Sequence, residues 1–370
     1  MNSRVVLTLV SLALLVGCTR SSPPEAEAPH FLVGGDISFL PEIEDHGGTY
    51  SDSGGEGDPV LLMKEHGFNS IRLKLWHTPD GSYNTLDQVR QMAARIDAAG
   101  MHFFLDIHYS DWWADPQKQI KPAAWDDLSF DALVDSVYQY SHDVIASLRS
   151  QGTVPSMVQI GNEIRPGMLW PEGRVDGDYD TPEQWDRLVT LLEAGRRGIL
   201  DAAAAEPPKI MIHFDNGAKN EICRYFFDQL VERGLDFDVI GLSFYPKWHG
   251  TLDELRHNLA DLTSRYDKDV YVVETAYPWT FDWRDEQGNI LGSEADLHEG
   301  YPPTVEGQSA FLSAVHTIVR NVPGGRGRGL YYWSPEWIAV EGVPSAWENA
   351  TLFDFEGRML PSMEAFTGRD

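Results

Sequence analysis

The chain has 370 residues, of which 42% are hydrophobic and 23% charged, so it can bury a large core and is not expected to be disordered. Its 57 Asp and Glu residues against 29 Lys and Arg give a formal net charge of −28. Phosphate recognition needs clustered basic side chains, so this balance argues against nucleic acids and anionic membrane surfaces as partners. A neutral substrate suits the chain better than a polyuronate, although acidity alone also serves solubility.

The first residues are predicted to be an export signal. Arg4 precedes an apolar run over 5–16 that is too short to span a bilayer and is typical of a signal-peptide core. The run ends in Leu15-Val16-Gly17-Cys18, which resembles the lipobox of bacterial lipoproteins. That resemblance implies that residues 1–17 are a lipoprotein signal peptide and that Cys18 becomes the lipidated first residue. An ordinary signal peptide with a chance cysteine is the alternative.

Residues 18–30 are predicted to join the lipidated cysteine to the fold. They are rich in Ser, Pro, Ala and Glu, which is the composition of a tether. The expected product is an exported, membrane-anchored bacterial lipoprotein, periplasmic or at the cell surface. It would touch the membrane only through its anchor.

Eight apolar runs with the composition of β-strands alternate with amphipathic helical segments from residue 31 onward. The expected strands are 31–36, 70–75, 102–107, 157–162, 209–214, 238–244, 270–274 and 329–333. Near-continuous apolar runs indicate parallel strands that are buried on both faces and joined by helical crossovers. Helix-start signals lie between them, including Asp58-Pro59 and a capping box from Thr251 to Glu254. Residues 31–370 are therefore predicted to form one catalytic α/β domain, a single (β/α)8 TIM barrel.

Long segments without periodicity follow several of these strands. They cover 36–57, 108–128, 164–180 and 275–303. In such a barrel the loops after the strands gather on one face, where active sites are built. No glycine-rich phosphate loop follows a strand, which removes the usual nucleotide-binding alternatives.

Two predicted strands lead into a glutamate. The run over 157–162 ends in Asn162 and is followed at once by Glu163, and the run over 270–274 ends in Glu274. Retaining glycosidases use two carboxyl groups about 5–5.5 Å apart, one as nucleophile and one as acid/base. A single acidic residue at a strand end is as often structural, but two on facing strands favour glycoside hydrolysis.

Aromatic and polar residues after the predicted strand ends fit a carbohydrate site. Pyranose faces stack on aromatic rings, and a few polar groups orient the sugar. The candidate substrate-binding residues are His108, Asp111, Trp112, Trp113, Asp215, Asn216, Trp248, Trp279 and Trp333. Any one of the tryptophans can instead belong to the core. A metal hydrolase is the other alternative for the His and Asp residues, but the chain lacks an HExxH motif.

Four stretches together resemble a known family. They are LDIHYSDWWADP (105–116), QIGNEIR (159–165), GLSFYPKW (241–248) and VVETAYPW (272–279). They are similar to the family-53 arabinogalactan endo-β-1,4-galactanases, which belong to the clan of barrel glycosidases with glutamates on strands four and seven. The resemblance runs from about residue 31 to the end of the eighth strand.

The resemblance implies roles for five residues. Glu163 would be the acid/base and Glu274 the nucleophile. Arg72 would lie beside the nucleophile and keep it ionised, and Tyr245 would donate a hydrogen bond to it. Asn162 would bind the sugar 2-hydroxyl. A buried ion pair within the barrel is the alternative for Arg72.

The segment after the seventh strand bears on metal binding. Bacterial members of the family often hold a structural calcium ion there, and Asp285 and Asn289 offer oxygen ligands. Trp283 and Arg284 interrupt the usual acidic pattern, so calcium is not favoured. No cofactor is expected to be required for the chemistry.

The sequence as a whole predicts a monomeric retaining endo-hydrolase of β-1,4-galactan, acting by double displacement on type I arabinogalactan or pectic galactan side chains. The nearest alternative is another β-1,4-glycanase of the same clan, a mannanase or a cellulase. A non-catalytic glycan-binding lipoprotein is the alternative outside enzymes. It would have no need of the residues that support a nucleophile.

Overall fold

The computed structural model describes residues 31–205 and 207–368. The predicted signal peptide, Cys18 and the tether lie outside the described residues. Within them, no helix combines the length and the apolar character that a membrane crossing requires.

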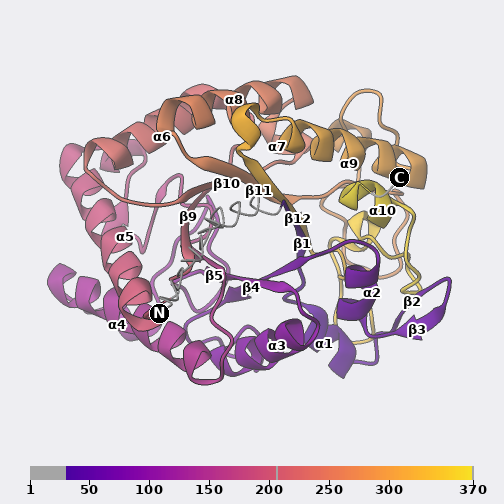
Figure 1. Cartoon of the computed structure of the whole chain (residues 1–370), viewed down its shortest axis with the longest axis horizontal. Coiled ribbons are helices and arrows are strands. Elements are labelled where there is room, and N and C mark those ends of the chain that lie inside the picture. Colours follow the sequence, from indigo (N-terminus) through magenta and orange to yellow (C-terminus); the bar gives the residue numbers. More distant parts are fainter. Residues whose placement is uncertain (1–30, 206, 369–370) are drawn as a thin grey trace, which may run out of the picture. The chain divides into compact units, whose positions relative to one another are not determined.

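Eight parallel strands form a closed barrel, as predicted (Figure 1). They follow the ring order β1-β12-β11-β10-β9-β6-β5-β4. Each coincides with one predicted apolar run, to within a few residues at the ends. Their bounds are β1 (Leu32–Asp36), β4 (Ser70–Leu75), β5 (His102–Ile107), β6 (Met157–Ile160), β9 (Lys209–Phe214), β10 (Val239–Ser243), β11 (Asp269–Thr275) and β12 (Gly327–Trp333).

Helices surround the strands and connect them in chain order (Figure 1). The longer ones are α2 (Pro59–Glu65), α3 (Leu86–Ala98), α4 (Phe130–Ser150), α5 (Pro182–Ala203), α6 (Asn220–Glu232), α8 (Leu252–Tyr266) and α9 (Val305–Arg320). Their apolar faces pack on the outward-facing residues of the strands. This arrangement confirms the predicted (β/α)8 barrel.

Short elements interrupt the loops. Three are helices, α1 (Leu40–Asp45), α7 (Pro246–His249) and α10 (Ser362–Thr367). Two are small hairpins, β2 (Tyr50–Asp52) with β3 (Gly55–Gly57), and β7 (Gly167–Met168) with β8 (Gly173–Arg174). Single 3₁₀ turns cover 123–125, 177–179, 294–296, 323–325 and 348–350.

The interior of the barrel is closed by side chains that the strands point inward. A separate apolar cluster contains Leu32, Phe104, Met157, Met211, Val239, Tyr271, Val273 and Tyr331. Alternate residues of a strand face opposite sides, so their neighbours pack outward against the helices. The guanidinium of Arg72 lies 5.7 Å from the ring of Phe104. Polar residues therefore lie next to this apolar cluster, on the side of the carboxyl ends of the strands.

The predicted capping box at the start of α8 is present. The Thr251 hydroxyl accepts a hydrogen bond from the Glu254 amide at 3.2 Å, and the Glu254 carboxylate accepts one from the Thr251 amide at 2.8 Å. Thr251→Ala removes the first of these bonds and is expected to lower the free energy of unfolding by about 1 kcal/mol. Denaturant unfolding of this variant beside Thr190→Ala, an exposed change inside α5, measures the effect. An equal loss in both variants would contradict a capping role.

Candidate active site

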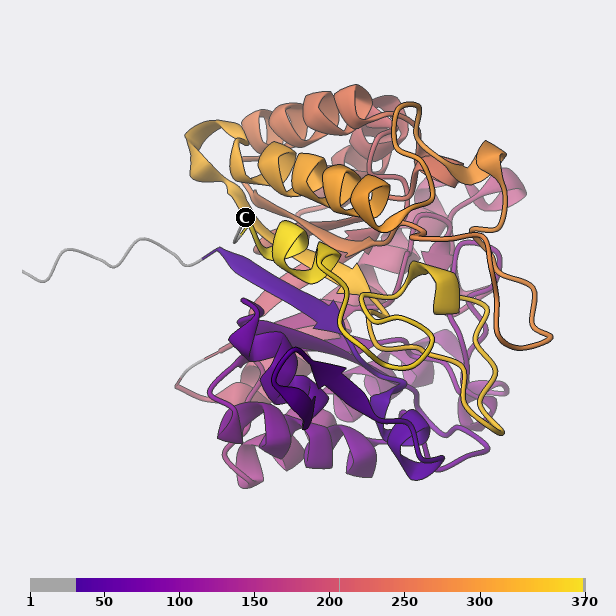
Figure 2. The same ribbon diagram turned by 90° about the vertical axis from the view of Figure 1, so that its right-hand side faces the viewer.

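A cavity of about 490 Å³ opens at the carboxyl ends of the strands. Glu163, after β6, and Glu274, on β11, both line it. In the barrel ring β9 and β10 lie between these two strands, so the carboxylates approach the cavity from separate sides. Loops 276–303 and 334–361 lie on the side of the barrel to which β1 points, the orange and yellow loops in Figure 2.

The backbone turns sharply where β6 ends. Gly161 has a φ of 76° and Glu163 a φ of 50°, both in the left-handed region. A side-chain-bearing residue is uncommon there, and such strain is concentrated at functional sites. The turn places the Glu163 side chain in the cavity, where its Oε1 accepts a hydrogen bond from the Ser243 hydroxyl at 2.6 Å.

A neutral histidine supports this serine. His213 is fully buried, and burial lowers its pKa well below the usual range, with the Arg72 charge acting in the same direction. Its Nδ1 lies 3.0 Å from both Gln159 Nε2 and Asn162 Oδ1 and 3.4 Å from the Glu163 amide nitrogen. Its Nε2 lies within hydrogen-bond distance of the Ser243 hydroxyl, at 2.8 Å. The chain from His213 through Ser243 to Glu163 fixes the position of the carboxylate.

Glu274 has different neighbours. Arg72 Nη2 lies 3.0 Å from its Oε1, and the Tyr245 hydroxyl donates to its Oε2 at 3.3 Å. The side chain is 6% exposed. This carboxylate is thus paired with a cation, whereas Glu163 forms no ion pair with any residue that the structure describes.

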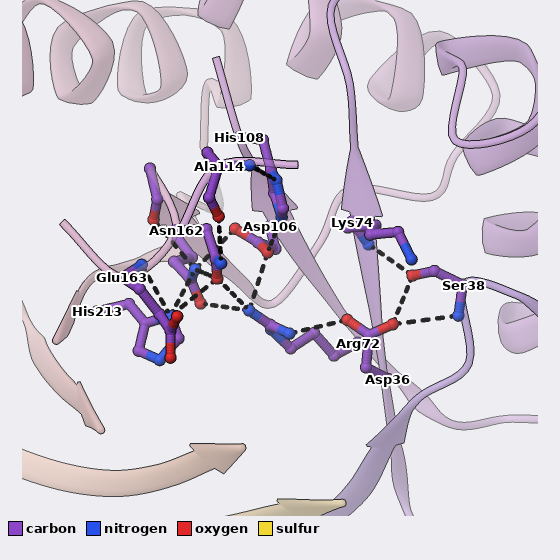
Figure 3. A network of polar contacts seen from close by, with 12 residues as sticks. Asp36, Ser38, Arg72, Lys74, Asp106, His108, Ala114, Asn162, Glu163 and His213 are labelled. Atoms are coloured by element: carbon purple, nitrogen blue, oxygen red, sulfur yellow. Dashed lines mark hydrogen bonds and ion pairs between the residues drawn. The ribbon is translucent and has the colours of Figure 1, made fainter. Parts of the chain in front are cut away.

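Arg72 is the centre of a buried polar network (Figure 3). Its Nη1 donates to Asp36 at 2.8 Å, and its Nη2 donates to Asp106 at 2.8 Å and to the Asn162 Oδ1 at 3.0 Å. One guanidinium thus faces three carboxylates, those of Asp36, Asp106 and Glu274. Both alternatives considered for Arg72 hold, because the same side chain forms ion pairs within the barrel and contacts Glu274.

Burial and charge separate the two glutamates. Burial raises the pKa of Glu163 well above its usual range, and the negative charges of Glu274 and Asp215 raise it further. Burial also raises the pKa of Glu274, to about 7, although the Arg72 guanidinium opposes the shift. The Arg72 guanidinium acts in the expected direction, since it lowers the pKa of Glu274, whereas burial and the charges of Asp106 and Asp36 raise that pKa. Arg72 contacts Glu274 and not Glu163, and this contact favours the ionised form of Glu274.

Comparisons with known proteins agree with this geometry. The model of glycosyl hydrolase family 53 matches residues 32–366. The chain belongs to this family. An arabinogalactan endo-β-1,4-galactanase of Cellvibrio japonicus is 36% identical over 357 residues, which cover 94% of this chain and 92% of that protein.

Two solved structures resemble this family 53 chain along most of their lengths. The family 53 catalytic domain of Ignisphaera aggregans is 38% identical with a TM-score of 0.85, over 93% of this chain and 98% of that one. A fungal β-1,4-galactanase is 33% identical with a TM-score of 0.78, over 90% and 98% respectively.

Other candidate residues line the same cavity of this family 53 hydrolase. Among the described residues they are His108, Asn162, Asp215, Asn216, Trp113, Trp248 and Trp333, with Arg72 and Tyr245. His108 Nε2 lies 3.0 Å from Asp106, and Arg165 Nε donates to Asp215 at 2.9 Å. The Asn162 amide donates one proton to the Ala114 carbonyl at 2.9 Å, which leaves its second proton for a ligand.

Three residues predicted to bind substrate lie outside the cavity lining. The Asp111 carboxylate accepts hydrogen bonds from the backbone amides of Thr78 and Ala123, at 2.9 and 2.8 Å, and so holds two loops together. Trp112 is 56% exposed, and its ring packs at a tilt against that of Trp76. Trp279 packs against Phe355.

Asp285, a candidate calcium ligand with Asn289, binds backbone amides. One Asp285 oxygen accepts the Gln287 amide at 2.6 Å and the other the Ser345 amide at 2.7 Å. No group of three or more His, Cys, Asp or Glu that could hold a metal occurs within 31–205 and 207–368. Hydrogen bonds join the loops that follow β11 and β12. Glu348 accepts them from the Arg284 and Asp285 amides at 2.5 and 3.4 Å.

Sequence reasoning missed several residues of the site. Ser243 and Trp347 both contribute, the first through Glu163 and the second in the lining, together with Arg165 and His249. Lys74 also lines the cavity, and the pattern of β4 could have predicted this. In β4 the charged Arg72 and Lys74 alternate with apolar residues, so both must point into the barrel.

A stability measurement can test the raised pKa of Glu163 without any substrate. A carboxyl with a raised pKa in the folded state stabilises the fold fully below its unfolded pKa, near 4.5. That contribution is lost as the pH rises through the folded pKa. Glu163→Gln cannot ionise, so its Tm is expected to exceed that of the wild type by more at pH 8 than at pH 4.

The exposed Glu221, in the first turn of α6, provides the control for this experiment. Glu221→Gln is expected to show no such pH dependence. A Tm difference for Glu163→Gln that is the same at both pH values would show that Glu163 has an ordinary pKa.

Proposed function

We propose that the chain is a retaining endo-hydrolase of β-1,4-galactan, acting on type I arabinogalactan or pectic galactan side chains. The observation that carries the proposal is that two glutamates with different neighbours line one cavity. Glu274 contacts Arg72, and Glu163 does not. The names of the relatives in Cellvibrio japonicus and in fungi support galactan as the substrate.

In the first half-reaction, protonated Glu163 gives its proton to the glycosidic oxygen. Ionised Glu274 attacks the anomeric carbon, so that the carbon–oxygen bond to the leaving chain breaks as the glycosyl-enzyme ester forms. Tyr245 and Arg72 hold the attacking carboxylate in place. Because Arg72 also pairs with Asp106, the position of its guanidinium is fixed, and this guanidinium orients the Glu274 carboxylate.

In the second half-reaction, ester formation has removed the charge of Glu274. The pKa of Glu163 therefore falls, since that charge was one of the causes that raised it. Glu163 accepts a proton from water, whose oxygen attacks the anomeric carbon and releases Glu274. The Ser243 hydroxyl donates to the carboxylate that Glu163 becomes between the two steps. Two displacements at one carbon give net retention.

The lining suits a neutral polysaccharide. Trp333, Trp113 and Trp347 form one aromatic wall, with ring centroids 6.2 Å apart for Trp113 and Trp333 and 4.7 Å apart for Trp333 and Trp347. Such rings bind the apolar faces of pyranoses. We assign the free amide proton of Asn162 to the sugar 2-hydroxyl. Asp215, Asn216 and Trp248 line the same cavity as Glu163, and we assign them to the sugar that leaves.

Release of reducing sugar from pure β-1,4-galactan, mannan and cellulose tests this function. Galactan is expected to be hydrolysed and the other two polymers left intact, with oligosaccharides of mixed length as early products. Faster hydrolysis of mannan or cellulose would favour the other glycanases of the clan. Binding of galactan without release by the wild type would favour a non-catalytic lipoprotein.

We also propose that the enzyme is anchored through Cys18, on the support of the lipobox sequence and the tether that follows it. Cys18→Ala is expected to move the protein from the membrane fraction to the soluble fraction and to leave its specific activity unchanged. Membrane association that persists in this variant would rule out the lipid anchor.

The enzyme is proposed to act as a monomer without a required cofactor, since both carboxylates and their supports come from one chain. Light scattering measures the mass in solution. Dialysis against a chelator is expected to leave turnover intact. If a calcium ion binds only the native state, its removal lowers the Tm alone.

A further inference from the structure

Lys74 is a buried cation that the proposed mechanism does not use. It follows Arg72 by two positions in β4, so both side chains point into the barrel. Its side chain is 2% exposed, and the residue contributes to the lining of the active-site cavity. In Figure 3 it lies on the other side of Arg72 from Glu163.

Aromatic rings lie against the Lys74 ammonium, and no carboxylate of the described residues lies within ion-pair distance of it. Its Nζ lies 3.8 Å from the centroid of the Phe39 ring and 4.2 Å from that of Trp113. Within the described part of the chain this nitrogen has no hydrogen-bond or ion-pair partner, since the hydrogen bond of Lys74 to Ser38 uses the backbone amide. Its three N–H donors are therefore unused. Burial of this ammonium lowers its pKa to about 8.

The nearby carboxylates do not pair with Lys74. Asp36 accepts hydrogen bonds from Arg72 and Ser38, and one oxygen of Glu336 accepts the Phe39 amide at 3.2 Å, while its other oxygen is buried and forms no hydrogen bond with a described residue. They influence Lys74 only through their charge. An ammonium that lines a binding cavity, and whose N–H donors bind no described protein group, is placed to donate a hydrogen bond to a bound ligand.

The surroundings define the chemistry of that ligand. Three carboxylates, those of Asp36, Asp106 and Glu274, pair with Arg72 and outnumber the two cations Arg72 and Lys74, which disfavours an anionic group such as a uronate. The flanking Trp113 and Trp333 rings bind an apolar face. A neutral pyranose meets both conditions, because it offers an apolar face to the rings and hydroxyl oxygens at its edge.

We propose that Lys74 donates a hydrogen bond from Nζ to one hydroxyl oxygen of the galactosyl unit held against Trp113 and Trp333, and that this bond selects the sugar. The inference rests on the proposed galactanase function. It makes Lys74 a specificity-determining residue that contacts substrate without taking part in bond breaking.

Aryl β-galactobiosides in which each hydroxyl in turn is replaced by hydrogen test this proposal. For the wild type, removal of one hydroxyl is expected to lower kcat/KM by about 10- to 100-fold, the range for a hydrogen bond to a charged donor. In Lys74→Met, kcat/KM for the parent substrate falls by a similar factor, and removal of that hydroxyl causes no further loss of kcat/KM. Removal of any other hydroxyl lowers kcat/KM by the same factor in the variant and in the wild type.

Lys64→Met is the matched control, because Lys64 Nζ donates to the Ala99 carbonyl and the residue does not line the cavity. It should keep the wild-type pattern. Equal losses at every position in Lys74→Met and the wild type would overturn the assignment of Lys74 alone. Failure of the wild type to cleave the parent galactobioside or galactan would count against the proposed function and against this inference with it.

A second measurement covers the case in which Lys74→Met does not fold. In ¹⁵N-lysine-labelled wild-type protein, the Nζ resonance that is missing from Lys74→Arg identifies Lys74. Galactobiose is expected to shift this resonance, and one of its monodeoxy analogues is expected to leave it unshifted. An unchanged resonance with saturating galactobiose would contradict the hydrogen bond.

Discussion

Glu274→Ala is expected to abolish hydrolysis of galactan and of a dinitrophenyl β-galactobioside alike. Without this carboxylate no glycosyl-enzyme can form, and a better leaving group does not replace the missing nucleophile. Azide fits in the space that the side chain vacates and is expected to restore cleavage of the activated substrate. Azide then attacks once, so the product is the α-galactobiosyl azide. The anomeric proton coupling in the NMR spectrum of the product distinguishes the two anomers.

Glu221→Ala, on the exposed face of α6, is the control and should match the wild type on both substrates. A β-azide from Glu274→Ala, or activity of this variant on the activated substrate without azide, would mean that Glu274 is not the nucleophile.

Glu163→Ala is expected to separate the two substrates. Hydrolysis of galactan should fall on the order of 10²- to 10⁴-fold, because its leaving alkoxide needs a proton from a general acid. The dinitrophenyl leaving group needs little protonation, so its first step should be nearly unaffected and glycosyl-enzyme should accumulate. Burst kinetics measure that accumulation.

Azide tests the same variant from the product side. It attacks the accumulated glycosyl-enzyme without the help of a base, so the expected product is the β-galactobiosyl azide. If sensitivity to the leaving group followed Glu274 rather than Glu163, the two roles would be exchanged.

The barrel was predictable because its signals are local. Each strand is a continuous apolar run, and the Thr251 capping box marks the start of α8 at the predicted residue. The two glutamates were predictable because each directly follows or ends such a run. Parallel strands bring their carboxyl ends to one face, so position in the chain alone placed both on the same rim.

The partners of these glutamates depend on closure of the ring. Ser243 reaches Glu163 because β9 lies between β6 and β10, and His213 on β9 bridges them. No local pattern specifies such contacts. The same limit explains Asp111, whose carboxylate binds backbone amides of its own and a neighbouring loop instead of lining the cavity.

The balance of charges around Arg72 also could not be predicted from the sequence. A rim arginine predicts an ionised nucleophile, and Arg72 does lower the pKa of Glu274. The number of carboxylates that share the guanidinium becomes visible only when Asp36 and Asp106 are brought together by β1 and β5. Burial then decides the direction of the shift.

The hydrogen bonds between the loops after β11 and β12 have a consequence for how activity is lost on heating. Glu348 accepts hydrogen bonds from the backbone amides of residues 284 and 285, and Asn349 donates to the carbonyls of Thr280 and Leu291. Trp347, which lines the cavity, directly precedes these two residues in the chain. Neither loop can move away from the cavity without breaking these hydrogen bonds. Inactivation and melting of the barrel should therefore share one temperature, rather than inactivation preceding melting through a loosened rim.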